Sequence, residues 1–237
     1  MKLKAIGFDL DDTLYSRKDF YEHVFDKMQT SVAYLNISFD RFYERFQIYS
    51  DAEYEKFMRR EKDRDAYKND RVISTYKYFD TQITVDAAVI FNALYLYYRN
   101  KIEYRVGVVE TLEYLKKQGY KLFVLTNGPM RDQLNKLEQL QIEKYISRED
   151  WYISDELNTT KPEKKIFKIV ENRIGFQGNE ILYIGDSFEN DILGASQLGW
   201  ETVYLKVHDV GIELANKVSV NSFTEILEII KEGEKNV

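Results

Sequence analysis

The chain of 237 residues has no cysteine, only two histidines and only two prolines. Without cysteine, disulfides, thiolate catalysis and zinc–thiolate sites are excluded. The two histidines, His23 and His208, are too few for a histidine-rich metal site, and we assign them no role. Any metal site would have to be built from oxygen atoms, which favours a hard ion such as Mg²⁺.

Long hydrophobic runs are also missing. No apolar run approaches the roughly 18 to 20 residues that cross a bilayer. The first apolar run is too short for a secretory signal, and Asp9 interrupts it. We therefore expect a cytoplasmic protein that does not bind membranes.

Basic residues do not outnumber acidic residues, and the formal net charge is −6. This balance creates no general attraction to phosphate polymers, so we expect no nucleic acid partner. The basic run Arg59–Lys68 is interleaved with acids and is interpreted as a solvated helix face. A small anionic substrate stays compatible with the charge, since one local cluster of cations can hold it.

Glycine and proline are absent from residues 15–101, which are rich in tyrosine, phenylalanine and charged residues. Helix-compatible segments run through this stretch at Phe20–Leu35, Phe39–Phe57 and Ala87–Tyr98. The alternation of strands and helices that is typical of the rest of the chain resumes at Ile102–Val106. We therefore predict an all-helical domain inserted after the first strand.

The remainder, residues 1–14 and 102–237, alternates short apolar runs with amphipathic segments. The predicted strands are Leu3–Leu10, Lys121–Thr126, Trp151–Ser154, Ile181–Gly185 and Glu201–Leu205. The predicted helices are Val108–Lys117, Arg131–Leu140, Glu163–Ile174 and Asp191–Leu198. Such alternation predicts an α/β fold with a Rossmann-like parallel sheet covered by helices on both faces.

Polar residues follow the predicted strands at the points where a parallel sheet places its ligands. The first strand runs into Asp9 and Asp11, with a hydroxyl at Thr13 that we expect to fix the turn. Asp12 is expected to be solvated or part of that turn. Three further clusters follow later strands: Thr126 with Asn127, Lys161 ahead of Pro162, and Asp186 with Asp191.

These side chains match the needs of phosphoryl transfer. A carboxylate can attack phosphorus and form an aspartyl-phosphate, and a second carboxyl group can carry the proton. The charge on the transferring group needs a cation and directional donors, roles that suit Mg²⁺, a lysine and a hydroxyl. Each cluster alone could be only a turn or a helix cap. The presence of all four clusters in this order along the chain favours a single site.

In these motifs the chain resembles the haloacid dehalogenase-like superfamily of hydrolases. The run from Asp9 to Thr13 is similar to its first motif, and Thr126-Asn127 to its second. Lys161 resembles the third motif, and the stretch Gly185–Asp191 the fourth. The resemblance implies a catalytic core at 1–14 and 102–237, with a type 1 helical cap at 15–101. The stretch from Thr126 to Phe167 is similar to small-molecule phosphatases of the house-cleaning nucleotidase type.

The resemblance implies a role for each catalytic and substrate-binding residue. Asp9 would be the nucleophile and Asp11 the general acid and base. Thr126 and the backbone N–H of Asn127 would bind the phosphoryl group. Lys161 would tie that group to the nucleophile and screen their mutual repulsion.

It also implies a metal site. Mg²⁺ would be held by the Asp9 carboxylate, the Asp11 backbone carbonyl and Asp186. Asp191 would lie behind these ligands and orient a metal-bound water or Lys161.

The sequence thus predicts a Mg²⁺-dependent phosphomonoester hydrolase for a small phosphorylated metabolite such as a nucleotide or sugar phosphate. We expect a monomer or a homodimer. The alternative is a phosphomutase of the same superfamily, because these motifs do not reveal how the cap controls water. Dehalogenation is disfavoured, since it would not need Asp11. A non-catalytic binding module would have lost the nucleophile, the acid or the lysine, and none is lost.

Overall fold

A computed structural model of the protein describes residues 3–206 and 218–235, so His208 lies outside the described residues. The chain divides into two compact units. One unit is an α/β unit made of Met1–Ser16 and Ile102–Val237, and the other is a helical unit made of Arg17–Lys101.

The α/β unit is built on a six-stranded sheet in the order β3-β2-β1-β4-β5-β6, and every neighbouring pair of strands is parallel. The strands are β1 (Ala5–Phe8), β2 (Lys121–Thr126), β3 (Trp151–Ile153), β4 (Ile181–Gly185), β5 (Glu201–Leu205) and β6 (Val218–Val220). The predicted parallel, Rossmann-like sheet is confirmed. Because β1 lies between β2 and β4, the ends of these three strands meet at the middle of one edge of the sheet.

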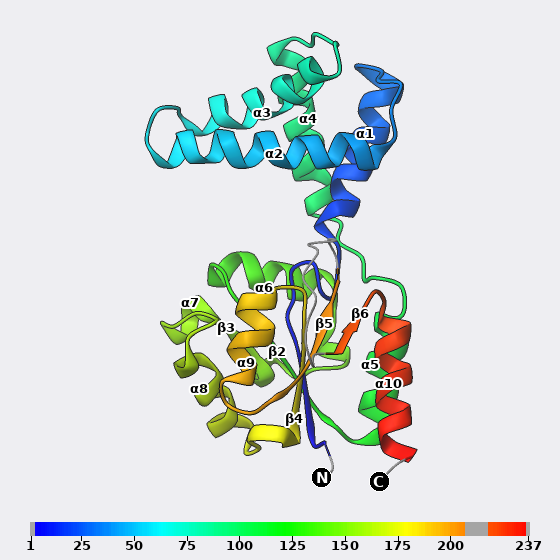
Figure 1. The fold of residues 1–237 in the computed structure, drawn as a ribbon, viewed down its shortest axis with the longest axis vertical. Coiled ribbons are helices and arrows are strands. Elements are labelled where there is room, and N and C mark those ends of the chain that lie inside the picture. The colour runs from blue at the N-terminus through cyan, green and yellow to red at the C-terminus, as the bar shows by residue number, and fades with distance from the viewer. Residues whose placement is uncertain (1–2, 207–217, 236–237) are drawn as a thin grey trace. The chain divides into compact units, whose positions relative to one another are not determined.

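Helices cover the sheet on both faces, with α8 and α9 on one side and α5 and α10 on the other (Figure 1). The α-helices of this unit are α5 (Val108–Gln118), α6 (Met130–Gln139), α7 (Ser154–Leu157), α8 (Lys164–Ile174), α9 (Gly194–Ser196) and α10 (Phe223–Lys235). Short 3₁₀ turns occupy Ile142–Lys144, Arg148–Asp150 and Gly178–Glu180, and a π-helical segment, η4, spans Phe188–Leu193. The glycine at 119 ends α5 in the left-handed conformation, as its position predicts.

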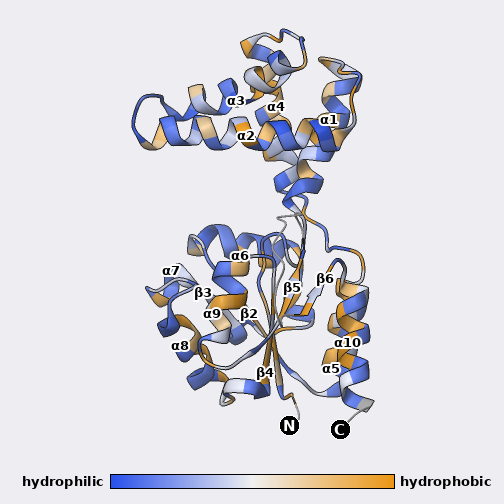
Figure 2. Ribbon diagram, in the orientation of Figure 1, coloured by the Kyte–Doolittle hydropathy of each residue, from blue (hydrophilic) through white to orange (hydrophobic). Residues whose placement is uncertain are grey.

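The core of the α/β unit is aromatic on the face covered by α8. Phe123, Tyr183, Phe167 and Trp200 are all buried there and pack at ring-centroid distances between 5.3 and 6.3 Å. Gly7 on β1 leaves room for this packing, because a Cβ atom at that position would lie 2.2 Å from the Phe123 ring. Figure 2 shows hydrophobic residues along the strands, whereas the helices carry both hydrophobic and hydrophilic residues.

The helical unit consists of α1 (Arg17–Ser31), α2 (Phe39–Met58), α3 (Arg64–Tyr78) and α4 (Val85–Arg99). Three of these helices begin at side chains that accept a hydrogen bond from the first turn, namely Ser38, Asp63 and Thr84. Its core gathers the phenylalanines and tyrosines of the glycine-free stretch, including Phe42, Phe46, Tyr76 and Phe91, which are fully buried. The aromatic excess in this stretch is therefore mainly helix packing.

The two chain segments that connect the α/β unit to the helical unit are hydrogen-bonded to each other within the α/β unit. The Arg105 backbone N–H donates to the carbonyl of Leu14 at 3.0 Å, and the Arg105 guanidinium donates to the carbonyl of Asp12 at 2.9 Å. Asp12 is buried and has a φ of 59°, so of the two expected alternatives the structure shows the turn residue and not the solvated side chain. The chain thus leaves and re-enters this unit through adjacent segments.

Some elements differ from the sequence expectation. Strand β6 and helix α10 were not predicted, although Phe223, Ile226 and Ile230 recur at helical spacing and are buried. The helix expected at Asp191–Leu198 begins earlier, as the π-helical η4 capped by Ser187, and continues into α9. None of the helices in the described residues is both long enough and apolar enough to cross a membrane.

Candidate active site

Asp9 lies directly after β1, at the carboxyl edge of the sheet, and its side chain is buried. Its Oδ1 accepts a hydrogen bond from Lys161 Nζ at 2.6 Å. The Thr13 hydroxyl lies 3.4 Å from Asp9 Oδ2 and donates to Asp186 Oδ1 at 3.1 Å. Thr13 therefore links the acids that follow β1 and β4, in addition to its place in the turn.

Lys161 is a buried cation surrounded by acceptors. Its Nζ lies 2.6 Å from Asp191 Oδ1 as well as from Asp9 Oδ1, 3.1 Å from the Leu125 carbonyl and 3.0 Å from the Tyr183 hydroxyl. Burial lowers the pKa of Lys161, but the charges of Asp191 and Asp9 outweigh it and raise the pKa well above its ordinary value. The lysine is therefore held charged against the Asp9 carboxylate.

The backbone of Lys161 is held by the side chain of Asn127, which follows β2. Asn127 Nδ2 donates to the Lys161 carbonyl at 3.0 Å, and the Lys161 N–H donates to Asn127 Oδ1 at 2.9 Å. This reciprocal pair ties the loop before α8 to the end of β2. The sequence assigned only a backbone N–H to Asn127, so its side-chain role is an addition.

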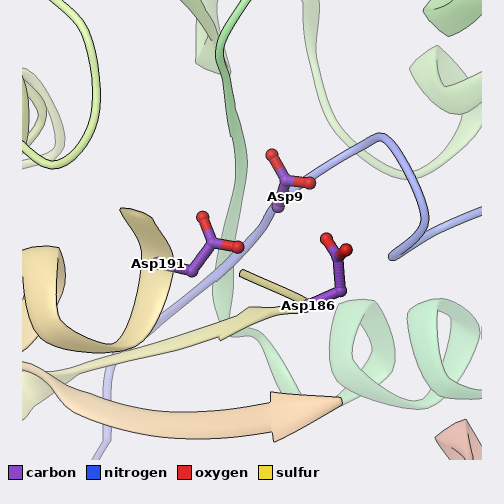
Figure 3. Close-up of side chains that lie close together, drawn as sticks. All are labelled: Asp9, Asp186 and Asp191. Carbon is purple, nitrogen blue, oxygen red and sulfur yellow. The ribbon is translucent and has the colours of Figure 1, made fainter. Parts of the chain in front are cut away.

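Asp9, Asp186 and Asp191 form a cluster of three carboxylates, each offering one oxygen within 4.8 Å of the others. Figure 3 shows the three side chains, from the ends of β1 and β4 and from η4, directed at a common space. Burial raises the pKa of Asp9, and the neighbouring charges of Asp191 and Asp186 raise it further against the opposing effect of Lys161. Such a set of oxygen donors suits a hard divalent cation such as Mg²⁺.

Asp191 approaches the end of β4 closely. Its Oδ2 accepts from the Ser187 N–H at 2.9 Å, while its Oδ1 contacts Lys161. A Cβ atom on Gly185 would lie 2.3 Å from the Asp191 carboxylate, so only glycine fits there without a shift. The Gly185-Asp186 step of the predicted fourth motif thus makes space for Asp191.

Asp11 is turned toward α6 and lies apart from the three-carboxylate cluster. Lys136 Nζ contacts both of its oxygens, at 2.7 and 2.8 Å, and Gln133 Nε2 donates to Oδ2 at 3.0 Å. The Tyr15 hydroxyl donates to Oδ1. Burial raises the pKa of Asp11, but Lys136, Tyr15 and Gln133 outweigh it and hold the pKa below its ordinary value. The carboxylate form of Asp11 is therefore favoured.

Gln133 joins Asp11 to the predicted phosphate-binding turn. Its Nε2 also lies 2.9 Å from Thr126 Oγ1 and 2.6 Å from the Asn127 carbonyl. Gly128 permits this approach, since a Cβ atom there would lie 2.7 Å from Gln133 Nε2. Gln133 and Lys136 were not predicted from the sequence; their spacing of three residues on the helix after Thr126-Asn127 indicates only that they share one helix face.

Comparisons with known proteins agree with this arrangement. Residues 3–199 match the family model described as haloacid dehalogenase-like hydrolase. The chain is 29% identical to a glyceraldehyde 3-phosphate phosphatase of Methanocaldococcus jannaschii, over 99% of this chain and all of that protein. It is 30% identical to a ribulose-1,5-bisphosphate 5-phosphatase of Halopiger xanaduensis, over 84% of this chain and 83% of that one. A solved structure of a HAD phosphatase from Thermococcus onnurineus, 26% identical, superposes with a TM-score of 0.57 over 96% of this chain and 98% of that one.

Proposed function

Because the chain belongs to the haloacid dehalogenase-like hydrolases, we propose that it is a Mg²⁺-dependent phosphomonoester hydrolase that acts through an aspartyl-phosphate intermediate. The observation that carries the proposal is the buried Asp9 carboxylate, which contacts the Lys161 ammonium and lies beside Asp186 and Asp191. A carboxylate fixed by a cation in this way is oriented to attack phosphorus. A cytoplasmic location stays a prediction from the sequence.

The names of the relatives support a substrate class. The proteins named glyceraldehyde 3-phosphate phosphatase and ribulose-1,5-bisphosphate 5-phosphatase both act, by their names, on short phosphorylated sugars. Both relatives align with more than four fifths of this chain. We therefore favour a triose or sugar phosphate over a nucleotide.

In the first half of the proposed reaction, an Asp9 oxygen forms a bond to phosphorus while the bond from phosphorus to the leaving oxygen breaks. Asp11 must first take up a proton, against the effect of Lys136, and it then gives that proton to the leaving oxygen, so the product departs as a neutral alcohol. The Thr126 hydroxyl and the Asn127 N–H bind the phosphoryl oxygens, and Lys161 balances their charge beside Asp9.

In the second half, the Asp11 carboxylate removes a proton from a water molecule as the water attacks phosphorus. The bond between Asp9 and phosphorus then breaks, which releases phosphate and restores the Asp9 carboxylate. Lys136 supports this step, because it favours the carboxylate form of Asp11. Asp191 keeps Lys161 in place throughout.

The donors present fit a divalent cation. Asp9, Asp186 and the Asp11 backbone carbonyl would hold Mg²⁺, and Asp191 contributes to the same negative cluster. When bound, the ion would offset the negative charge that the carboxylates share with the phosphoryl group. We expect excess chelator to abolish turnover and added Mg²⁺ to restore it; unchanged turnover in chelator would contradict the metal assignment.

The decisive experiment replaces the nucleophile. Asp9→Asn is expected to lower the release of phosphate from glyceraldehyde 3-phosphate and 4-nitrophenyl phosphate by about 10³-fold or more. Asp132→Asn, an exposed carboxylate on α6, serves as the matched control and should retain wild-type rates. Hydrolysis by Asp9→Asn at the parent rate would overturn the assignment. Isomerisation of a sugar phosphate without net phosphate release would instead identify a mutase.

A further inference from the structure

Four cationic side chains lie on facing surfaces of α3 and α4 in the helical unit. Arg64, Lys68 and Arg71 are spaced by four and three residues, which places them on one face of α3. Arg99 lies seven residues, or two turns, after Asn92 on α4. Within the described part of the chain, none of the four forms an ion pair with a carboxylate.

Hydrogen bonds show that these two faces meet. The Arg71 guanidinium lies 3.5 Å from Asn92 Oδ1, and Asn92 Nδ2 donates to Asn69 Oδ1 at 2.9 Å. Burial lowers the pKa of Lys68, and the nearby arginines lower it further, with Asp65 acting in the opposite direction. The three arginines Arg64, Arg71 and Arg99 therefore lie within electrostatic range of Lys68.

Arg71 is the buried member of this cluster. Its side chain is 8% exposed and packs against the rings of Phe46 and Tyr67, at 5.0 and 5.8 Å from the ring centroids. Its Nε has no hydrogen-bond partner among the described residues. A buried guanidinium that only stabilised the fold would be expected to meet a carboxylate, because an unpaired buried charge is costly.

Exposure increases along the cluster from Arg71 outward. Lys68 and Arg99 are half-buried, and Arg64 is exposed. The run Arg59–Lys68, which the sequence suggested was a solvated face, thus contributes its last cations to a partly buried site. In a chain of net charge −6, this unpaired concentration of positive charge is unusual.

We propose that Arg64, Lys68, Arg71 and Arg99 form an anion-binding site in the helical unit, suited to a phosphate or carboxylate group. Guanidinium groups bind both anions through paired hydrogen bonds, and the lysine adds a point charge. The anion is a free one such as inorganic phosphate. The site does not depend on the proposed hydrolase activity.

The test is a titration of the full chain with inorganic phosphate, followed by NMR at the Arg71 Nε–H and the α3 amides. A saturable shift at these signals is expected, and Lys68→Gln should weaken the apparent affinity about tenfold. Lys77→Gln, an exposed lysine in the last turn of α3, is the matched control and should bind as the parent does. Because this readout needs no turnover, it succeeds or fails independently of the hydrolase assignment.

No saturable shift on α3 and α4, or equal affinity in Lys68→Gln and the parent, would overturn the site. Steady-state kinetics add a second check. Lys68→Gln should leave the KM for ribulose 1,5-bisphosphate and for 4-nitrophenyl phosphate unchanged while its phosphate affinity falls. A KM raised for ribulose 1,5-bisphosphate alone would contradict the assignment to a free anion.

Discussion

Lys136 on α6 contacts both carboxylate oxygens of Asp11, at 2.7 and 2.8 Å. In the proposed mechanism Asp11 carries the proton, so Lys136 acts as a positioning residue for that carboxyl group. In that mechanism the helix that follows Thr126-Asn127 also orients the proposed general acid and base.

Lys136→Met should lower turnover of alkyl phosphates about ten- to a hundredfold, because a misplaced Asp11 cannot protonate a poor leaving group. Turnover of 4-nitrophenyl phosphate should fall less, because its leaving group departs without protonation and only the attack of water still needs Asp11. Steady-state kinetics with both esters measure the difference. Arg131→Gln, an exposed cation on the same helix, should affect neither ester. Equal losses on both esters would mean that Lys136 does not act on the protonation of the leaving group by Asp11.

Asn127→Ala should destabilise the protein and reduce activity together. It removes the two hydrogen bonds that hold the Lys161 backbone, at a cost of about 1–3 kcal/mol in the free energy of unfolding. Urea unfolding measures the stability and phosphate release the activity. The exposed Asn135→Ala on α6 is the control. Full activity in Asn127→Ala would show that Lys161 is positioned without this clamp.

Gly185→Ala should cost about 1–3 kcal/mol of stability and most of the activity, because its Cβ displaces the Asp191 carboxylate from Lys161. Gly233→Ala is the matched control: nothing lies within 4 Å of the added Cβ, and the residue is in α10. That variant should be neutral or more stable by about 0.5–1 kcal/mol. Thermal unfolding of both variants tests the pair, and similar behaviour would refute the close-approach argument.

Glu171 gives a pH-dependent prediction. Burial raises the pKa of Glu171, but hydrogen bonds from Lys168, Trp200 and the Gly178 N–H outweigh it and lower the pKa below its ordinary value. A lowered folded-state pKa contributes stability above the unfolded value of about 4.3, and that stability is lost as the pH falls through the folded value.

Glu171→Gln should therefore be about 1–2 kcal/mol less stable than the parent at pH 7, with the gap closing at acid pH. Urea unfolding at neutral pH and below the unfolded-state pKa measures the gap. Glu138→Gln, an exposed acid on α6, should show no such gap. A gap that stays constant with pH would exclude the charge as its origin.

The sequence was sufficient to predict the parallel sheet of the α/β unit apart from β6, and the residues that follow its strands. Parallel strands end at one edge of the sheet, so Asp9, Thr126 and Asp186 had to approach one another. Gln133 and Lys136 could not be found in this way, because whether a polar side chain on a helix faces the site depends on the rotation of that helix. The buried position of Asp12 and the hydrogen bonds of Asn127 likewise depend on tertiary contacts made by distant segments.

The hydrogen bond between Arg105 and Leu14 has a consequence for how such an enzyme can diversify. Since the chain departs and returns at neighbouring points, the helical unit is a modular insert, and its length is not constrained by closure of the sheet. We expect insertions, deletions or wholesale exchange of this unit to be tolerated by the α/β unit. Substrate preference could then evolve by replacing one contiguous stretch of gene, while the phosphoryl chemistry is inherited intact.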